Sequence, residues 1–314
     1  MRDCAVFFTH RWDDRIARHY ERFRREAGRE VEVRLAVQLG DGQELPGDVT
    51  PDIVVTDEAA RTHLPQRHAH YRGSGSVWGY VDLFWLTAFA NPSLAAFERF
   101  WLVEYDVDYA GDWGEFFGAT SGWNDDLLIT HLRQRTLEPD WNWSDRVRDP
   151  LGREDNHLIA FFPISRFSRA ALAAVGVAYV DPGWDGHFEM LIPTIVARAG
   201  LMVGDMGGDG ALTPQARRGH HYRGDFVTLY RAFDSYGWGP PMQHYYAESR
   251  AGFWSRNRLY HPIKTGLTGV TSASAWWMKF RDRVLAGLAG ALGRRDLLRI
   301  RWSRKLRRHQ GDHR

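Results

Sequence analysis

The sequence has a single cysteine, Cys4, among its 314 residues. One thiol cannot form an intrachain disulfide, and zinc sites built from several cysteines are excluded as well. No stretch approaches the roughly 18 uninterrupted apolar residues of a spanning helix, and the apolar run at residues 4–8 is too short for a signal peptide. Internal repeats and a clear domain linker are also lacking. We therefore expect a cytoplasmic protein.

The composition is that of an ordinary globular chain, with 44% hydrophobic and 25% charged residues and a formal net charge of +2. This length suits one large α/β domain or two smaller ones with a sizeable core. Fourteen tryptophans and fourteen histidines stand out. Such rings are common in sugar and nucleotide sites, but core packing accounts for many of them equally well.

The beginning of the chain alternates predicted strands and helices. We expect strands at residues 5–9, 31–37 and 52–56, and an amphipathic helix at residues 13–27. This order favours a doubly wound, mostly parallel sheet with flanking helices. Ligands of such sheets bind beyond the carboxyl ends of the strands.

The later elements follow from the same patterns. We expect a strand at residues 157–163 and helices at 79–90, 165–175 and 187–199, with loops at 71–76 and 138–156. The glycine-rich stretch 204–210 lacks the Gly-Lys-Ser/Thr ending of a phosphate-binding loop, so it is predicted to be a plain loop.

An apolar strand at residues 100–104 runs into three acidic residues, Glu104, Asp106 and Asp108. Because they are two apart, an extended chain projects all three from one face. Like charges held together there repel unless a cation or ligand lies between them. We predict that Asp106 and Asp108 hold a divalent metal. The alternative interpretation is a solvated strand end or a helix cap. A phosphohydrolase is disfavoured, since its aspartate pair belongs on the first strand, which here ends in Thr9 and His10.

A second acidic group, Asp185 and Glu189, lies at the start of the helix predicted over residues 187–199. The helix dipole lowers the pKa of a carboxylate there, which suits a base that must be ionised near neutrality. We predict that Glu189 takes the proton of an acceptor hydroxyl. Asp185 is the alternative base, and helix capping explains either acid equally well.

Together, the Asp106-Val107-Asp108 strand end, Ser165-Arg166 leading into a helix, and the segment 185–189 resemble GT-A-fold glycosyltransferases. The later half is similar to the core-2/xylosyltransferase branch, and bacterial and fungal glycosyltransferase-like proteins with Glu-Tyr-Asp-Val strands are more similar still. The resemblance covers residues 4–265. It implies a GT-A-like, Rossmann-like α/β catalytic domain over residues 1–278, with a donor-binding half (1–110) and an acceptor half (111–278).

The resemblance further implies a nucleoside-diphosphate sugar as donor and an inverting transfer to a hydroxyl acceptor. Asp106 would lie near the ribose or the metal and Asp108 on the metal, Mn²⁺ or Mg²⁺. Lys264 is a candidate cation for the diphosphate, and Asp82 a candidate contact of the nucleotide. One departure matters: core-2-type enzymes need no metal. Gly186 also replaces the acid that precedes their histidine, so the choice between the two bases stays open.

The end of the chain, residues 279–314, is strongly basic, and leucines are interleaved with its arginines. We expect a basic helical tail, which suits the anionic inner face of a membrane and a lipid-linked or cell-envelope acceptor. It also suits nucleic acid, or simply a solvated surface. The alternative function is therefore a polyanion-, nucleic-acid- or membrane-surface-binding protein on a non-catalytic GT-A-like scaffold.

Overall fold

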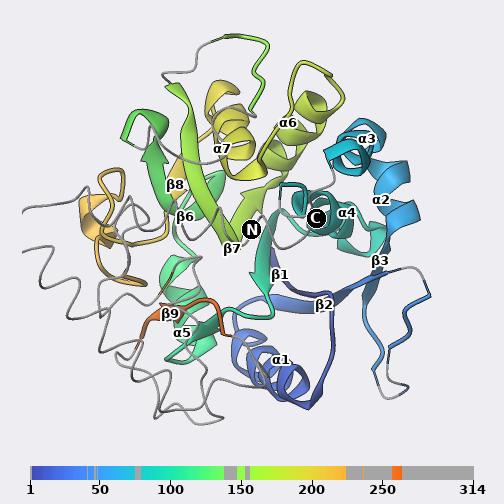
Figure 1. Cartoon of the computed structure of the whole chain (residues 1–314). Helices are drawn as coiled ribbons and strands as arrows, with labels where there is room; N and C mark the ends of the chain where they lie inside the picture. The colour runs from blue at the N-terminus through green and yellow to red at the C-terminus, as the bar shows by residue number, and fades with distance from the viewer. Residues whose placement is uncertain are drawn as a thin grey trace, which may run out of the picture.

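The computed structural model describes residues 2–40, 42–45, 47, 49–74, 79–137, 147–152, 156–223, 236 and 257–263. In this part of the chain, strands form one seven-stranded sheet with helices packed against it (Figure 1). Lys264 and the predicted tail, 279–314, lie outside the described residues. None of the helices in the described part is long and apolar enough to cross a bilayer.

The sheet is mixed and mostly parallel. Its strands, in spatial order, are β3 (Ile53–Thr56), β2 (Glu32–Leu39), β1 (Asp3–Thr9), β4 (Arg99–Glu104), β7 (Leu158–Ser168), β6 (Leu127–Gln134) and β8 (Val203–Asp205). Neighbours pair in parallel except β7, which is antiparallel to both β4 and β6. Strands from both predicted halves of the chain therefore share one sheet, which is compatible with a Rossmann-like fold.

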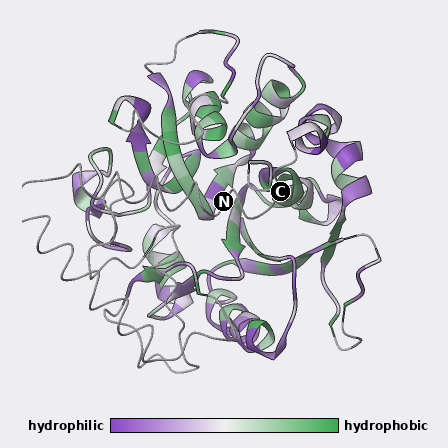
Figure 2. Cartoon of the chain, in the orientation of Figure 1, coloured by the Kyte–Doolittle hydropathy of each residue, from purple (hydrophilic) through white to green (hydrophobic). Residues whose placement is uncertain are grey.

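Helices cover both faces of this sheet. They are α1 (Asp14–Ala27), α2 (Asp57–His63), α3 (Pro65–Ser74), α4 (Asp82–Phe89), α5 (Trp113–Thr120), α6 (Arg169–Tyr179) and α7 (Phe188–Arg198). Side chains alternate along β1, so Val6 faces a core shared with α4, α6 and α7, whereas Phe7 faces one shared with α1 and α5. Figure 2 shows the hydrophobic colour concentrated along the strands and the hydrophilic colour on outer helix turns.

Short elements complete the described part. Three 3-10 turns are η1 (Pro92–Leu94), η2 (Arg135–Leu137) and η5 (Gln215–Arg217), and β5 (Asp108–Tyr109) pairs antiparallel with β9 (Leu259–Tyr260) in a second, two-stranded sheet. This small sheet brings the distant segment 257–263 beside the end of β4, because β5 follows β4 closely in the sequence.

Most predicted elements are confirmed, and the helix predicted over residues 165–175 is present but starts four residues later, as α6 (Arg169–Tyr179). Ser165 and Arg166 continue β7, where they pair with β4. The helix starts at Arg169, because the Ser168 hydroxyl caps it by accepting the Ala171 N–H at 3.1 Å. The loop predicted at 71–76 is also wrong in part, since α3 extends to Ser74. The Ser165-Arg166 motif therefore does not begin a helix.

A buried ion pair joins α3 to α4. Arg67 and Asp82 are both almost completely buried, and Arg67 donates from Nε and Nη2 to the two carboxylate oxygens at 3.1 and 2.9 Å. The Tyr179 hydroxyl donates to the same carboxylate at 2.7 Å. Asp82 thus fastens three helices in the core.

We expect Asp82→Ala to lower the free energy of unfolding by about 3–5 kcal/mol, because it leaves the Arg67 charge buried without its partner. Urea unfolding measures the change. The matched control is Glu58→Ala, which removes an exposed i,i+3 pair with Arg61 and should leave stability nearly unchanged. An equally small loss in both variants would contradict a structural role for Asp82.

Candidate functional site

The acidic residues after β4 do not share one face. The strand ends at Glu104 and the chain turns, with the Val107 N–H donating to the Glu104 carbonyl at 2.9 Å. The two-residue spacing predicts a common face only for an extended chain. The turn therefore separates Asp106 from Asp108, and the expected Asp106–Asp108 pair is replaced by two different environments.

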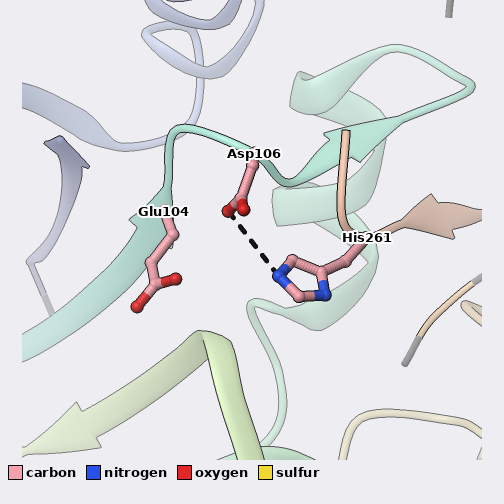
Figure 3. A group of neighbouring side chains, drawn as sticks. All are labelled: Glu104, Asp106 and His261. Carbon is pink, nitrogen blue, oxygen red and sulfur yellow. Dashed lines mark ion pairs between the residues drawn. The ribbon is translucent and has the colours of Figure 1, made fainter. Parts of the chain in front are cut away.

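Glu104, Asp106 and His261 form a group that could hold a metal ion, with one ligand atom from each lying within 4.8 Å of the others. Figure 3 shows Asp106 extending from the turn toward the His261 ring, whose Nε2 lies 3.6 Å from Asp106 Oδ1. Asp106 and His261 are buried, and Glu104 is half-buried. Ile263 anchors the incoming segment by donating its N–H to the Asp106 carbonyl at 2.7 Å.

The chemistry of this group suits a divalent transition metal. Carboxylate oxygens are ligands for Mg²⁺ and Mn²⁺, whereas an imidazole nitrogen favours transition metals. Two carboxylates with one histidine therefore fit Mn²⁺ better than Mg²⁺, which prefers a shell of oxygens. His261 comes from a segment remote in sequence from Asp106, so no local spacing points to it.

Asp108 is held by α1 instead. Arg22 Nη1 donates to both Asp108 carboxylate oxygens at 2.7 and 3.0 Å, and the Tyr109 N–H donates to Oδ1 at 2.7 Å. Arg22 Nη2 also donates to the carbonyls of Tyr109 and Gly111. The Asp108 charge is thus compensated by an arginine. Asp108, predicted as a metal ligand, therefore lies outside the group that could hold a metal; Asp106, predicted with it, belongs to that group together with Glu104 and His261.

Glu189 lies in the first turn of α7 and is buried. Burial raises its pKa to about 8; the Arg133 charge acts to lower this pKa and the Glu104 charge to raise it further. Loss of solvent thus outweighs the helix dipole, which we expected to keep this acid ionised near neutrality. Without a bound cation Glu189 is largely protonated at pH 7. The Glu104 charge acts on this pKa, which relates Glu189 electrostatically to the group that could hold a metal.

Asp185, the alternative base, is occupied by donors. Arg148 donates to Oδ2 at 2.7 Å, the Tyr80 hydroxyl and the Gly186 N–H donate to Oδ1 at 3.1 and 2.8 Å, and His70 Nδ1 lies 2.9 Å from Oδ1. Burial by itself raises the pKa of Asp185, but these partners, Arg148 foremost, lower it below the ordinary value. A carboxylate this weakly basic and this fully engaged is better suited to holding its neighbours than to accepting a proton.

The two remaining predicted contacts have different outcomes. Asp82 is completely buried against Arg67 and Tyr179, which leaves it no surface for a nucleotide. Lys264 lies outside the described residues. Sequence reasoning also missed Arg133, a buried residue near the end of β6, because that strand was not predicted.

We expect Asp106→Asn and His261→Ala each to weaken Mn²⁺ binding by more than about tenfold, since losing a direct ligand should cost at least as much as losing an outer-shell group. Mn²⁺ titration followed by electron paramagnetic resonance measures the affinity. Asp108→Asn is the control: it should weaken the attachment of α1 but leave Mn²⁺ affinity within about threefold, because Asp108 lies outside the ligand group. Loss of binding in Asp108→Asn alone would reverse the assignment.

Glu189 gives the protein a pH-dependent stability. Its pKa is about 8 in the folded protein and 4.5 in a model peptide, so between these pH values the folded state binds the extra proton. The contribution of this proton to the free energy of unfolding is complete below about pH 4.5 and is lost as the pH rises to about 8. Over this range the free energy of unfolding falls by up to about 1.4 kcal/mol per pH unit. In metal-free protein, Glu189→Gln should therefore gain stability relative to wild type across this window. The free energy of unfolding, measured by urea at several pH values, checks this expectation. Glu115→Gln is the control, because Glu115 is exposed. If the free energies of wild type and Glu189→Gln change in parallel with pH, the raised pKa of Glu189 is refuted.

Comparison with known proteins adds no assignment. No protein-family model matches the chain, and no curated protein matches it in sequence. The function is therefore argued from the geometry of the site.

Proposed function

We propose that the protein is a glycosyltransferase, which moves a sugar from a nucleoside-diphosphate sugar to an acceptor hydroxyl with the help of a divalent metal. The observation that carries this proposal is the Glu104, Asp106 and His261 group at the carboxyl end of β4. In a mostly parallel sheet, ligands bind at this edge. A metal held there would neutralise a diphosphate and stabilise it as a leaving group.

The end of β1 supports a nucleotide at the same edge. β1 and β4 are parallel neighbours, and the Tyr105 N–H donates to the Phe8 carbonyl at 3.0 Å. The rings of His10 and Tyr105 lie 5.2 Å apart, edge to face, with His10 exposed and Tyr105 half-buried. Aromatic faces beside a metal group favour a ligand with a planar base next to its phosphates.

We further propose that the α/β fold of the protein is GT-A-like. Its support is the mostly parallel sheet with helices on both faces, and the acidic turn that directly follows the strand paired with β1. The acidic end of β4 supports the resemblance to GT-A-fold enzymes better than the later half of the chain does. In that half, Ser165 and Arg166 lie within the strand β7 and do not begin a helix.

Glu189 is the proposed base on the acceptor hydroxyl. Because its pKa is about 8, the Glu189 carboxylate is a strong proton acceptor once it is ionised. Positive charge brought near Glu104 favours that ionised form. Direct displacement by the activated hydroxyl inverts the anomeric centre. A lipid-linked or cell-envelope acceptor remains part of the proposal, as does a membrane-surface role for residues 279–314.

Calorimetric titration with a panel of nucleoside diphosphates tests the proposal. We expect at least one to bind with Mn²⁺ and to lose about tenfold or more in affinity without it, because the metal neutralises the diphosphate. Asp106→Asn should behave like metal-free protein, and Glu189→Gln should retain full binding.

Truncation after Met278 distinguishes the proposed transferase from the alternative, a polyanion-binding protein. A transferase of this kind keeps nucleoside-diphosphate binding without residues 279–314, whereas a polyanion-binding protein loses its affinity for heparin or nucleic acid. Absence of nucleoside-diphosphate binding in the full chain, combined with polyanion binding lost on truncation, would overturn the transferase in favour of the alternative.

A further inference from the structure

A cavity of about 280 Å³ lies where α2, α4 and α6 meet the start of β4. Its lining is mostly apolar and belongs to the core on that face of the sheet. The apolar side chains that line it are Leu64, Leu86, Phe89, Phe100, Leu172 and Val175. Phe100 is the second residue of β4 and Glu104 is the last, so about 13 Å of strand separates this end of β4 from the metal group. The cavity is therefore distinct from the candidate metal site.

The size and the lining of the cavity suit a small apolar ligand. Ligand pockets in proteins are lined mainly by apolar side chains, and a few polar groups orient the ligand within them. An apolar cavity of about 150 Å³ is large enough to bind benzene. The present cavity has nearly twice that volume, so by the same proportion it has room for about 10–12 non-hydrogen atoms.

Helix α6 leaves this space open. Four of its residues that line the cavity are spaced i, i+3, i+4 and i+7 and so lie on one face of the helix. They are Arg169, Leu172, Ala173 and Gly176. Glycine is unfavourable in a helix interior. Apart from the two adjacent residues and the backbone of α6, a Cβ at Gly176 would meet no atom within 4 Å. Packing therefore does not require this glycine, and its missing side chain contributes to the open space.

Arg169 brings a positive charge to the cavity. Its guanidinium carbon lies 5.1 Å from the centroid of the Phe100 ring, which is part of the lining. Its Nη2 donates to the carbonyls of Leu94 and Ala95 at 3.2 and 2.6 Å. Nε and Nη1 make no hydrogen bond to the described residues, and no described carboxylate forms an ion pair with this guanidinium. The charge is thus held in place, and two of its nitrogen atoms can still donate to a ligand.

The other two ionisable side chains of the lining carry no charge near neutral pH. Burial lowers the pKa of His63, so its imidazole is neutral at pH 7. The Tyr179 hydroxyl donates into the core, to the Asp82 carboxylate at 2.7 Å. None of the described residues that line the cavity is acidic. The lining therefore combines an apolar space with a single cation, a pattern that favours an apolar ligand with a negatively charged group.

We propose that the cavity binds a medium-chain carboxylate, with its apolar tail between α2, α4 and α6 and its carboxylate on Arg169. A planar guanidinium matches the geometry of a carboxylate and can donate to both of its oxygens. A chain of about eight carbons fits the volume of the cavity. The inference does not rest on the proposed function, because none of the residues that line the cavity belongs to the metal group.

Calorimetric titration of the full chain with octanoate tests the site. Each buried methylene raises the affinity by about three- to fourfold, so octanoate should bind at least about fiftyfold more tightly than butyrate. Octan-1-ol has the same tail without the charge and should bind at least about tenfold more weakly than octanoate, because hydrogen bonds to charged groups are stronger. No octanoate binding at millimolar concentration, or equal affinities for octanoate and octan-1-ol, would overturn the proposal.

Arg169→Gln tests the position of the carboxylate. We expect the preference for octanoate over octan-1-ol to fall below about threefold, because the charge is removed while the apolar lining remains. The preference is a ratio within one variant, so a small change in packing affects both ligands alike. Arg169→Lys keeps the charge without the planar fork and should retain part of the preference. An unchanged preference in Arg169→Gln would overturn the role of Arg169.

Gly176→Leu tests whether the tail enters the cavity. The added side chain projects from the helix face that lines the cavity, so we expect octanoate affinity to fall by about tenfold or more. Gly118→Leu is the matched control, because Gly118 is a half-buried helix glycine of α5 whose Cβ would make only ordinary contact with Glu30. It should leave octanoate affinity unchanged.

Ala173→Phe narrows the cavity from the same face of α6 and provides the same test if Gly176→Leu does not fold. Octanoate binding that is undiminished in the cavity variants would place the ligand elsewhere and overturn the proposal.

The outcome is independent of the metal group. Asp106→Asn should bind octanoate as tightly as wild type does, and a loss of octanoate binding in this variant would contradict a separate site. Octanoate binding without any nucleoside-diphosphate binding would leave the cavity proposal intact and overturn the glycosyl-transfer proposal. Nucleoside-diphosphate binding without octanoate binding would do the reverse.

Discussion

The ion pair between Arg22 and Asp108 is the interaction on which the arrangement of the site depends. It fastens the chain after β4 to α1 through both carboxylate oxygens and two neighbouring carbonyls. With Asp108 held there, Asp106 lies in the turn between Glu104 and Asp108 and approaches His261. β5 then pairs with β9, and the segment that carries His261 arrives beside Asp106. Asp108 thus belongs to a structural ion pair, whereas Asp106 belongs to a group that could hold a metal.

Charge balance at this edge explains the remaining features. Glu104, Asp106 and Glu189 gather where β4 ends, and burial makes each ionised form costly. Burial is the main cause of the raised pKa of Glu189, about 8; the Glu104 charge raises this pKa further, and the Arg133 charge lowers it. A divalent cation held by Glu104 would offset the negative charge that opposes ionisation of Glu189. The same set of side chains therefore explains both the affinity expected for a metal and the protonation of the acid beside it.

Much of the fold follows from local sequence patterns, because hydrophobic periodicity and capping residues act over a few positions. The strands near residues 5–9 and 52–56, the helix beginning after Asp13 and the acidic end of β4 are of this kind. The site is different. Glu104, Asp106 and Asp108 share a face only if the chain stays extended. In the structure the chain turns after Glu104, and Asp108 pairs with Arg22, a residue of α1 that is remote in the sequence. His261 reaches the site through the pairing of β5 with β9, which leaves no local signal in the sequence.

Crystals grown with Mn²⁺, and anomalous diffraction measured at the manganese edge, show directly whether Glu104, Asp106 and His261 bind a metal. We expect one strong anomalous peak within coordination distance, about 2.0–2.3 Å, of the side-chain atoms of these three residues. Arg22 should still hold Asp108 in the same crystals. A manganese ion bound by Asp108, or no peak beside His261 at saturating Mn²⁺, would contradict it.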